Sequence, residues 1–219
     1  MPAVVGGLAA ASTLSAAQRW DPRRAALAAA AVLSSTALVE AAGTRTGVPF
    51  GRYSYTGALR PHVGGVPVVV PAAWLAMALP SREAAHAALG ATSTPLRRVL
   101  LGAAALTAWD LFLDPQMVGE GYWRWDAAGR YRGIPVTNFL GWFLAGSAVM
   151  GVLEAMLPIG RADEADAALV AQYGFVAAME TVGFGAFFRD RLVAVAGGAA
   201  MLPIAGAATV RLFGRRVRG

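Results

Sequence analysis

Seven long apolar segments constrain the fold of this chain more than any other feature of its sequence. They cover residues 2–17, 25–43, 64–79, 98–118, 135–157, 167–188 and 192–210. A helix needs about 20 mostly apolar residues to cross a lipid bilayer. The sequence therefore predicts an all-α fold, a polytopic membrane bundle of about seven transmembrane helices that forms a single domain over residues 1–219.

The composition agrees with lipid as the main solvent of the chain. Only 15% of the residues are charged and 57% are hydrophobic, whereas a typical soluble domain has about 25% charged residues. The sequence contains no cysteine, and all 19 basic residues are arginine. Disulfides, thiolate metal sites, thiol nucleophiles and lysine Schiff bases are therefore excluded. The arginines stand between apolar segments as membrane-flank anchors, so nucleic acid is not an expected partner.

The distribution of arginine predicts the orientation in the membrane. With seven spans, eleven of the 19 arginines, Arg161 and Arg218 among them, lie on the side of the C-terminus and eight on the other. This excess predicts a multi-pass protein of the plasma membrane with a cytoplasmic C-terminus. Residues 2–17 are interpreted as a helix, because a secretory signal would begin with basic residues.

Local signals predict some boundaries between these segments. Pro67 favours the start of the third helix, and Pro71 is expected to tighten or kink its first turns. Residues 81–96 predict a short surface helix that ends in a turn at Thr94-Pro95.

Four carboxylic acids lie inside apolar segments that run in the same direction: Glu40, Asp110, Asp114 and Glu180. A charge inside a membrane is energetically costly, so each acid marks a candidate functional site. All four lie past the middle of their segments, and we expect them to gather toward one membrane face. Glu154 lies toward the other face and is interpreted as a helix-end or packing residue.

Asp110 and Asp114 are four residues apart, which places them one turn apart on one face of a helix. Two carboxylates so close in a low dielectric cannot both be ionised cheaply, so one is expected to keep its proton. A protonated carboxylic acid is what acid chemistry on a lipid requires. The alternative is that each acid forms a structural ion pair with an arginine such as Arg45 or Arg124. The pair could also hold Mg²⁺, although a diphosphate site would need a second acidic pair.

Aromatic side chains crowd the predicted loops on the same face as these acids. An interfacial aromatic belt would explain any single ring. Rings grouped around acids would also form an apolar pocket that stabilises a carbocation by cation–π attraction. The candidate substrate-binding residues are Phe50, Tyr53, Tyr55, Trp74, Trp109, Trp123, Trp125, Asn138, Phe139 and Trp142. His62 and His86 are predicted on opposite sides of the membrane, so no metal site is expected.

Several ordered motifs resemble the CruF-type carotenoid biosynthesis proteins, which are integral-membrane carotenoid hydratases. The similarity covers roughly residues 35–190. The motifs are TGVPFGRYSY (46–55), GVP (65–67) with Trp74, WDxxxDP (109–115), GYWxW (121–125) and GIPxxNFxGW (133–142).

The resemblance implies a hydro-lyase without a cofactor that acts in the membrane on an acyclic, lycopene-like carotenoid. Water would add to the terminal 1,2 double bond of the ψ-end and give a 1-hydroxy carotenoid. In our hypothesis, Asp110 or Asp114 protonates C2 and leaves a tertiary cation at C1. Glu40 or Glu180 then positions and deprotonates a water molecule, to which Asn138 is hydrogen-bonded.

Two other classes of function stay open at this point. A carotenoid end-group cyclase or a prenyl-extending enzyme would use similar acids and rings around a similar carbocation. The prenyl-extending enzyme would also need a divalent metal and basic groups for diphosphate. A transporter or lipid-binding membrane protein could use the acids for proton coupling, although no paired repeats are visible.

Overall fold

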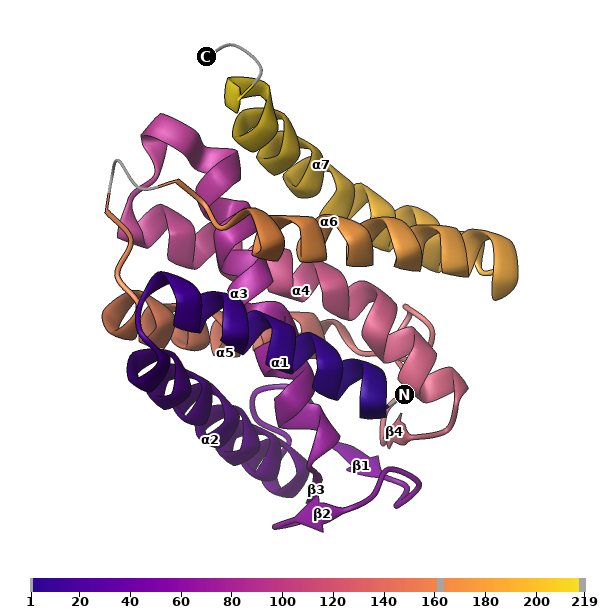
Figure 1. Ribbon diagram of the computed structural model, residues 1–219. Coiled ribbons are helices and arrows are strands. Elements are labelled where there is room, and N and C mark those ends of the chain that lie inside the picture. The colour runs from indigo at the N-terminus through magenta and orange to yellow at the C-terminus, as the bar shows by residue number, and fades with distance from the viewer. Residues whose placement is uncertain (1, 161–163, 217–219) are drawn as a thin grey trace.

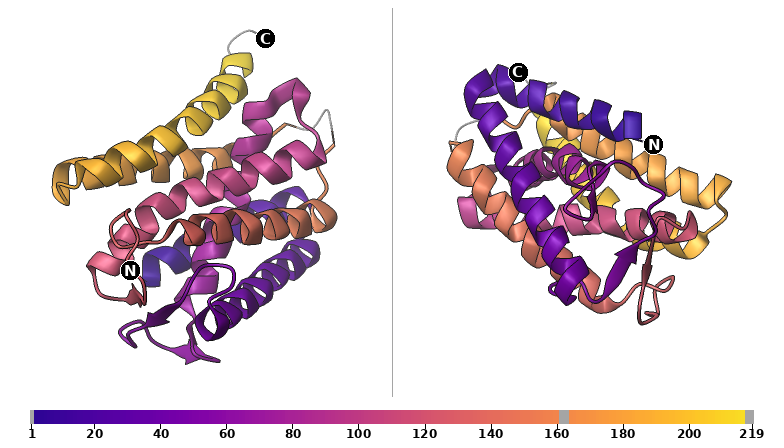
Figure 2. Two further views of the ribbon diagram at one scale, coloured as in Figure 1. Left: turned by 180° about the vertical axis from the view of Figure 1, so that it is seen from behind. Right: turned by 90° about the horizontal axis from the view of Figure 1, so that it is seen from below.

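The computed structural model describes residues 2–160 and 164–216, and these residues form a bundle of seven α-helices (Figures 1 and 2). The helices are α1 (Pro2–Arg19), α2 (Pro22–Thr46), α3 (Val69–Leu89), α4 (Pro95–Gly119), α5 (Val136–Met156), α6 (Ala167–Val182) and α7 (Arg191–Arg216). The short elements are β1 (Tyr53–Tyr55), β2 (His62–Val63), β3 (Val66–Pro67), β4 (Trp123–Trp125), the 3₁₀ turn η1 (Gly90–Thr92) and the π-helical turn η2 (Gly183–Phe187). Arg161 and Arg218, used above to predict the orientation, lie outside the described residues.

Four of these helices are long and apolar enough to cross a membrane. They are α2, α5, α6 together with η2, and α7 as far as Leu212. The helical bundle is confirmed, and four of its helices meet the length and hydropathy of a span. The count of about seven spans stays a prediction. Both α3 and α4 carry charged side chains along their length, such as Glu83 and Asp110, which lowers their mean hydropathy.

Helix α3 runs through the middle of the bundle, so the expected surface helix over residues 81–96 is wrong. Every residue from Ala73 to Ala87 is buried. The charged residues in this stretch suggested a surface, but they form ion pairs with neighbouring helices inside the protein. The helix begins at Val69 and not at Pro67, which lies in β3. Pro71 falls in the first turn, where a missing backbone N–H is tolerated.

Helix ends follow the local sequence signals closely. Asp21 caps α2 by accepting two backbone N–H groups at 2.6 and 3.4 Å, and Pro22 is the first helical residue. Thr94 and Pro95 start α4 in the same way, at the predicted turn. Gly47, with a φ of 79°, ends α2 in the left-handed conformation that glycine adopts readily. This turn sends the chain back toward the end of α2, where β1 follows.

The aromatic loops are partly ordered as a two-stranded antiparallel ribbon. Strands β1 and β4 pair Tyr53 with Trp125, Ser54 with Arg124, and Tyr55 with Trp123. Side chains alternate between the two faces of a strand, so the four rings share one face and the two polar residues the other. The chain therefore brings aromatic residues from two distant loops to the same surface.

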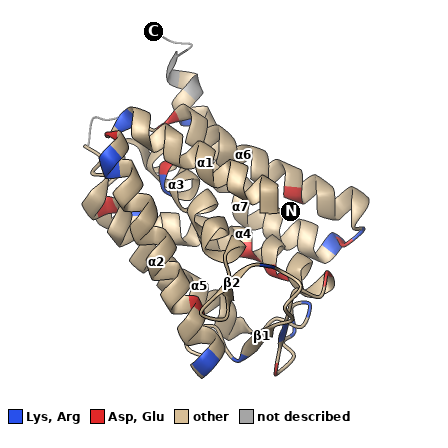
Figure 3. Ribbon diagram, turned by 60° about the horizontal axis from the view of Figure 1, so that its bottom comes forward, with Lys and Arg blue, Asp and Glu red and all other residues tan. Residues whose placement is uncertain are grey.

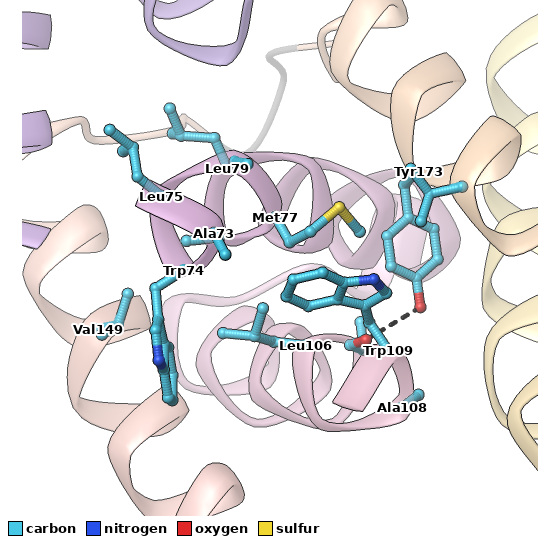
Figure 4. Packing of buried hydrophobic residues seen from close by; sticks show 14 of the residues in the cluster. Ala73, Trp74, Leu75, Met77, Leu79, Leu106, Ala108, Trp109, Val149 and Tyr173 are labelled. Atoms are coloured by element: carbon cyan, nitrogen blue, oxygen red, sulfur yellow. Dashed lines mark hydrogen bonds between the residues drawn. The ribbon is translucent and has the colours of Figure 1, made fainter. Parts of the chain in front are cut away.

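The core lies between α3, α4, α5 and α6 (Figure 4). Trp74 of α3 lies beside Val149 of α5, and Leu106 of α4 lies between this indole ring and Tyr173 of α6. Tyr173 is fully buried, and its hydroxyl group donates to the carbonyl oxygen of Ala105 at 3.2 Å. A buried hydroxyl group needs such an acceptor, and this hydrogen bond fixes α6 on α4.

Charged residues are sparse along the helices and gather near helix ends and loops (Figure 3). At one end of the bundle, Arg82 of α3 and Arg98 of α4 both bind Glu154 of α5, at 2.8 and 2.6 Å. Glu83 of α3 binds Arg19 of α1 at 2.8 Å. These contacts join four helices and give Glu154 the packing role that we expected for it.

Candidate active site

An apolar cavity of about 230 Å³ lies beneath the aromatic ribbon, between α1, α2, α3, α4, α5 and α6. Three of the four predicted acids line it: Glu40, Asp114 and Glu180. Nine predicted binding residues also line it, namely Phe50, Tyr53, Tyr55, Trp74, Trp109, Trp123, Trp125, Asn138 and Trp142. The tenth, Phe139, does not, because the neighbouring Asn138 takes the inward face of α5. Its ring packs edge-on against Tyr131, with ring centroids 5.7 Å apart.

Indole rings form one wall of the cavity. Trp74 and Trp142 stack with their centroids 3.9 Å apart and an angle of 7° between the planes. Trp109 meets Trp142 edge-on at 6.2 Å. From the ribbon, Trp125 packs against Tyr53 at 4.9 Å. Such rings present electron-rich faces that attract a positive charge.

Glu40 has three hydrogen-bond donors and no arginine partner among the described residues. The hydroxyl groups of Tyr53 and Tyr55 donate to its Oε2 atom, Tyr55 at 2.7 Å. The indole N–H of Trp74 donates to Oε1 at 3.0 Å. Helix α2 supplies the acid, ribbon strand β1 two donors and α3 the third. Hydrogen bonds of this kind stabilise the ionised carboxylate and oppose the effect of its burial.

The two tyrosine hydroxyls keep their protons throughout the ordinary pH range. Burial raises the pKa of Tyr53 and Tyr55, and the negative charge of Glu40 raises both further. An ionised tyrosine beside Glu40 would place two negative charges together in a low dielectric. Both residues therefore act only as donors toward this carboxylate.

Asp110 and Asp114 share one amide. The Nδ2 atom of Asn138 donates to Oδ2 of Asp110 at 2.8 Å and to Oδ2 of Asp114. No described N–H group bonds to the other oxygen of Asp110. Two buried carboxyl groups this close cannot both be ionised cheaply, so we expect one of them to keep a proton. Asp114 lines the cavity, whereas Asp110 lies fully buried behind it.

The loop before α5 fixes the position of this amide. The Tyr131 hydroxyl donates to the carbonyl oxygen of Leu111, one residue after Asp110, at 2.8 Å. Burial raises the pKa of Tyr131 to about 12, and the nearby aspartates contribute, so the donor stays protonated. One turn along the same face of α5, Gly141 lies against the backbone of Pro49, where a Cβ atom would come within 2.7 Å of the carbonyl oxygen. Only glycine allows this approach.

The four predicted acids do not form the structural ion pairs that were the alternative interpretation. In the described part of the chain, the ion pairs join Arg19 with Glu83, Arg82 and Arg98 with Glu154, and Arg132 with Asp190. Glu40, Asp110, Asp114 and Glu180 take part in none of them. Neither Arg45 nor Arg124, the suggested partners, forms an ion pair or a side-chain hydrogen bond with these acids among the described residues.

Glu180 is separate from the other three acids. It lines the cavity from α6, and no residue within 2–160 or 164–216 forms a hydrogen bond or an ion pair with its side chain. Glu40, Asp110 and Asp114 interact electrostatically with one another. The expected gathering of four acids is thus a cluster of three and a fourth acid elsewhere in the same cavity.

Sequence reasoning missed two parts of the site. It assigned no role to the first helix, yet Val4, Val5 and Leu8 of α1 line the cavity. It also missed the ribbon, although Tyr-Ser-Tyr and Trp-Arg-Trp each alternate ring and polar residues with the period of a strand. That alternation was the available signal for the ribbon.

The two histidines lie near opposite ends of α3. His62 lies in β2, and His86 is buried near the end of α3, with its Nδ1 atom 2.8 Å from the Ser93 hydroxyl. Across the described residues, no three His, Asp or Glu side chains are placed to hold a metal ion together.

Comparison with known proteins identifies a family for this chain. A family of carotenoid biosynthesis proteins matches residues 2–210, nearly the whole chain. The chain belongs to this family. The chain is similar to the bisanhydrobacterioruberin hydratase of Haloarcula japonica, with 35% identity over 131 residues. The aligned region is 58% of this chain and spans less than half, 44%, of that protein. No solved structure matches the chain significantly.

Proposed function

We propose that this protein is a carotenoid hydratase that adds water to the terminal 1,2 double bond of an acyclic carotenoid. One observation carries the proposal: an apolar cavity is lined both by Glu40, which has three hydrogen-bond donors, and by Asp114, which shares the Asn138 amide with the buried Asp110. Membership of a carotenoid biosynthesis family and similarity to a hydratase support the same chemistry. The name of that relative adds bisanhydrobacterioruberin to lycopene as a candidate substrate.

The Asp110–Asp114 pair acts as the acid. Asp114 lines the cavity and transfers the shared proton to C2, using the electrons of the double bond. The positive charge then lies on the tertiary carbon C1. The faces of Trp74, Trp109 and Trp142 stabilise this cation and keep bulk water away.

Glu40 acts as the base. It orients one water molecule toward C1 and takes a proton from it as the C–O bond forms. The amide Nδ2 of Asn138 is committed to the two aspartates, which leaves its carbonyl oxygen for the water. The reaction adds one water without redox change, and the cycle closes when the proton of Glu40 returns to the aspartate pair. No cofactor enters this scheme.

The experiment is expression in a host that makes lycopene, and separately in membranes supplied with bisanhydrobacterioruberin, in water enriched in oxygen-18. We expect a product heavier by one water that carries the heavy oxygen. Asp114→Asn and Glu40→Gln should each lower its rate of formation by about 10²–10⁴-fold. Glu120→Gln, at an exposed position, is the matched control with normal activity.

Three outcomes would overturn the proposal. A product of the same mass as the substrate would identify an end-group cyclase instead. Unchanged pigment together with proton-coupled transport in proteoliposomes would identify a transporter. Full activity of both acid variants would refute the assigned roles.

A further inference from the structure

The contact between α1 and α6 is closed at one end and open at the other. Near the end with the ion pairs, the Ser15 hydroxyl donates to Asp166 at 2.8 Å, and the Gln172 amide donates to the Ser12 hydroxyl at 3.1 Å. Beyond Ser12, Ala9 is the last buried residue toward the start of α1. The two helices diverge from this point toward the ribbon (Figure 1).

Side chains along the diverging part face the cavity and the outside at once. Val4 of α1 is 64% exposed and Met179 of α6 is 45% exposed, and both line the cavity. One helical turn closer to the Ser12–Gln172 contact, Leu8 and Val176 also line it. This wall of the cavity is therefore a gap between two helix faces and not a sealed contact.

The size of the cavity requires such an opening. Sites that enclose a drug-sized ligand have volumes of about 300–1,000 Å³, and a carotenoid is longer than these ligands. A cavity of about 230 Å³ holds an end group only, so the polyene must lie outside it. The residues that flank the gap are apolar except for Glu180, and α6 is one of the helices suited to lipid.

We propose that the cavity opens sideways into the bilayer between the first half of α1 and the second half of α6. The polyene lies in this opening, and its end group reaches Glu40 and Asp114. The inference rests on the proposed function, because it assigns a long acyclic carotenoid to the cavity. Glu180 borders the opening and has no contact with the other acids, so it lies beside the polyene and takes no part in proton transfer.

The test is to fill the opening with a large side chain. Val4→Trp and Met179→Trp are compared with Leu14→Trp, which changes a 63% exposed residue of α1 that does not line the cavity. Each protein is given a carotenoid and a short acyclic terpene that ends in the same double bond. We expect the two opening variants to lower kcat/KM for the carotenoid at least tenfold more than for the terpene. Leu14→Trp should behave as the wild type.

Binding is measured separately from turnover, by the absorbance of carotenoid that the purified proteins retain. The opening variants should retain at least tenfold less carotenoid than the wild type and Leu14→Trp. Equal retention by all four proteins, or equal losses on both substrates, would overturn the opening. A wild type that retains carotenoid but does not hydrate it would instead overturn the proposed function, with the opening upheld by the loss of retention.

Discussion

Three donors from three parts of the chain meet the carboxylate of Glu40. The hydroxyl groups of Tyr53 and Tyr55 both donate to it; Tyr53 is buried, and Tyr55 is half-buried. The Trp74 N–H is fully buried in the core. Each hydrogen bond to a charged group contributes about 1.5–3 kcal/mol. Together they favour the ionised form of Glu40, and no described arginine pairs with it whose positive charge would repel the cationic intermediate.

Tyr55→Phe removes one of these donors and keeps the ring. Because a hydrogen bond to a charge is worth about 1.5–3 kcal/mol, we expect kcat to fall by about 10- to 100-fold while KM changes little. Steady-state hydration in membranes measures both constants. Tyr122→Phe is the control, because Tyr122 is only half-buried and makes no hydrogen bond to Glu40. A Tyr55→Phe enzyme with the kcat of the wild type would show that this donor does not support the base.

The helices place the arginine–glutamate ion pairs at one end and the aspartates of the site at the other. Helices α3, α4 and α5 alternate in direction, so Arg82 and Arg98 meet Glu154 at one end, and Asn138 meets the aspartates at the other. Arg98 donates to both oxygens of Glu154, at 2.6 and 2.9 Å to one oxygen each. Such a two-point contact is strong and directional. It anchors the bundle without adding positive charge to the cavity.

Glu154→Gln removes the carboxylate that forms ion pairs with the buried guanidinium groups of both Arg82 and Arg98. Removal of one partner from a buried ion pair costs about 3–5 kcal/mol, so thermal unfolding in detergent should begin at a clearly lower temperature. Hydration per folded molecule should stay normal, because the site lies at the other end of the helices. Asp126→Asn, an exposed acid, is the control for stability. An unchanged unfolding temperature would mean that these ion pairs add nothing to stability.

At the scale of the whole molecule, the sequence predicts the site better than the architecture. Acids such as Glu40 and Asp114 stand out because lipid-like segments exclude charge, and topology alone gathers them. The charges of α3 misled the same reasoning, because Arg82 and Glu83 are neutralised by partners far away in the sequence. The role of α1 was equally hidden, since a cavity wall arises from how two helices diverge and not from a motif.

Whether α3 and α4 cross the membrane can be tested with single cysteines, because the protein contains no cysteine of its own. We predict that Ser54→Cys and Glu120→Cys lie on one side of the membrane and Ala91→Cys on the other. Helix α3 separates residue 54 from residue 91, and α4 separates residue 91 from residue 120. All three residues are exposed. In intact cells, an impermeant maleimide should label Ser54→Cys and Glu120→Cys, whereas Ala91→Cys should react only after the membrane is opened.

The arginine excess at the C-terminal side predicts this assignment, because it places the loop after α3 in the cytoplasm. The cysteine-free parent protein is the blank, and each variant is first checked for hydration. Labelling of all three positions from outside would mean that α3 and α4 form a hairpin that does not cross, held within the bundle by its buried ion pairs. The acids would then lie at a different depth, and the route of the polyene between α1 and α6 would have to be redrawn.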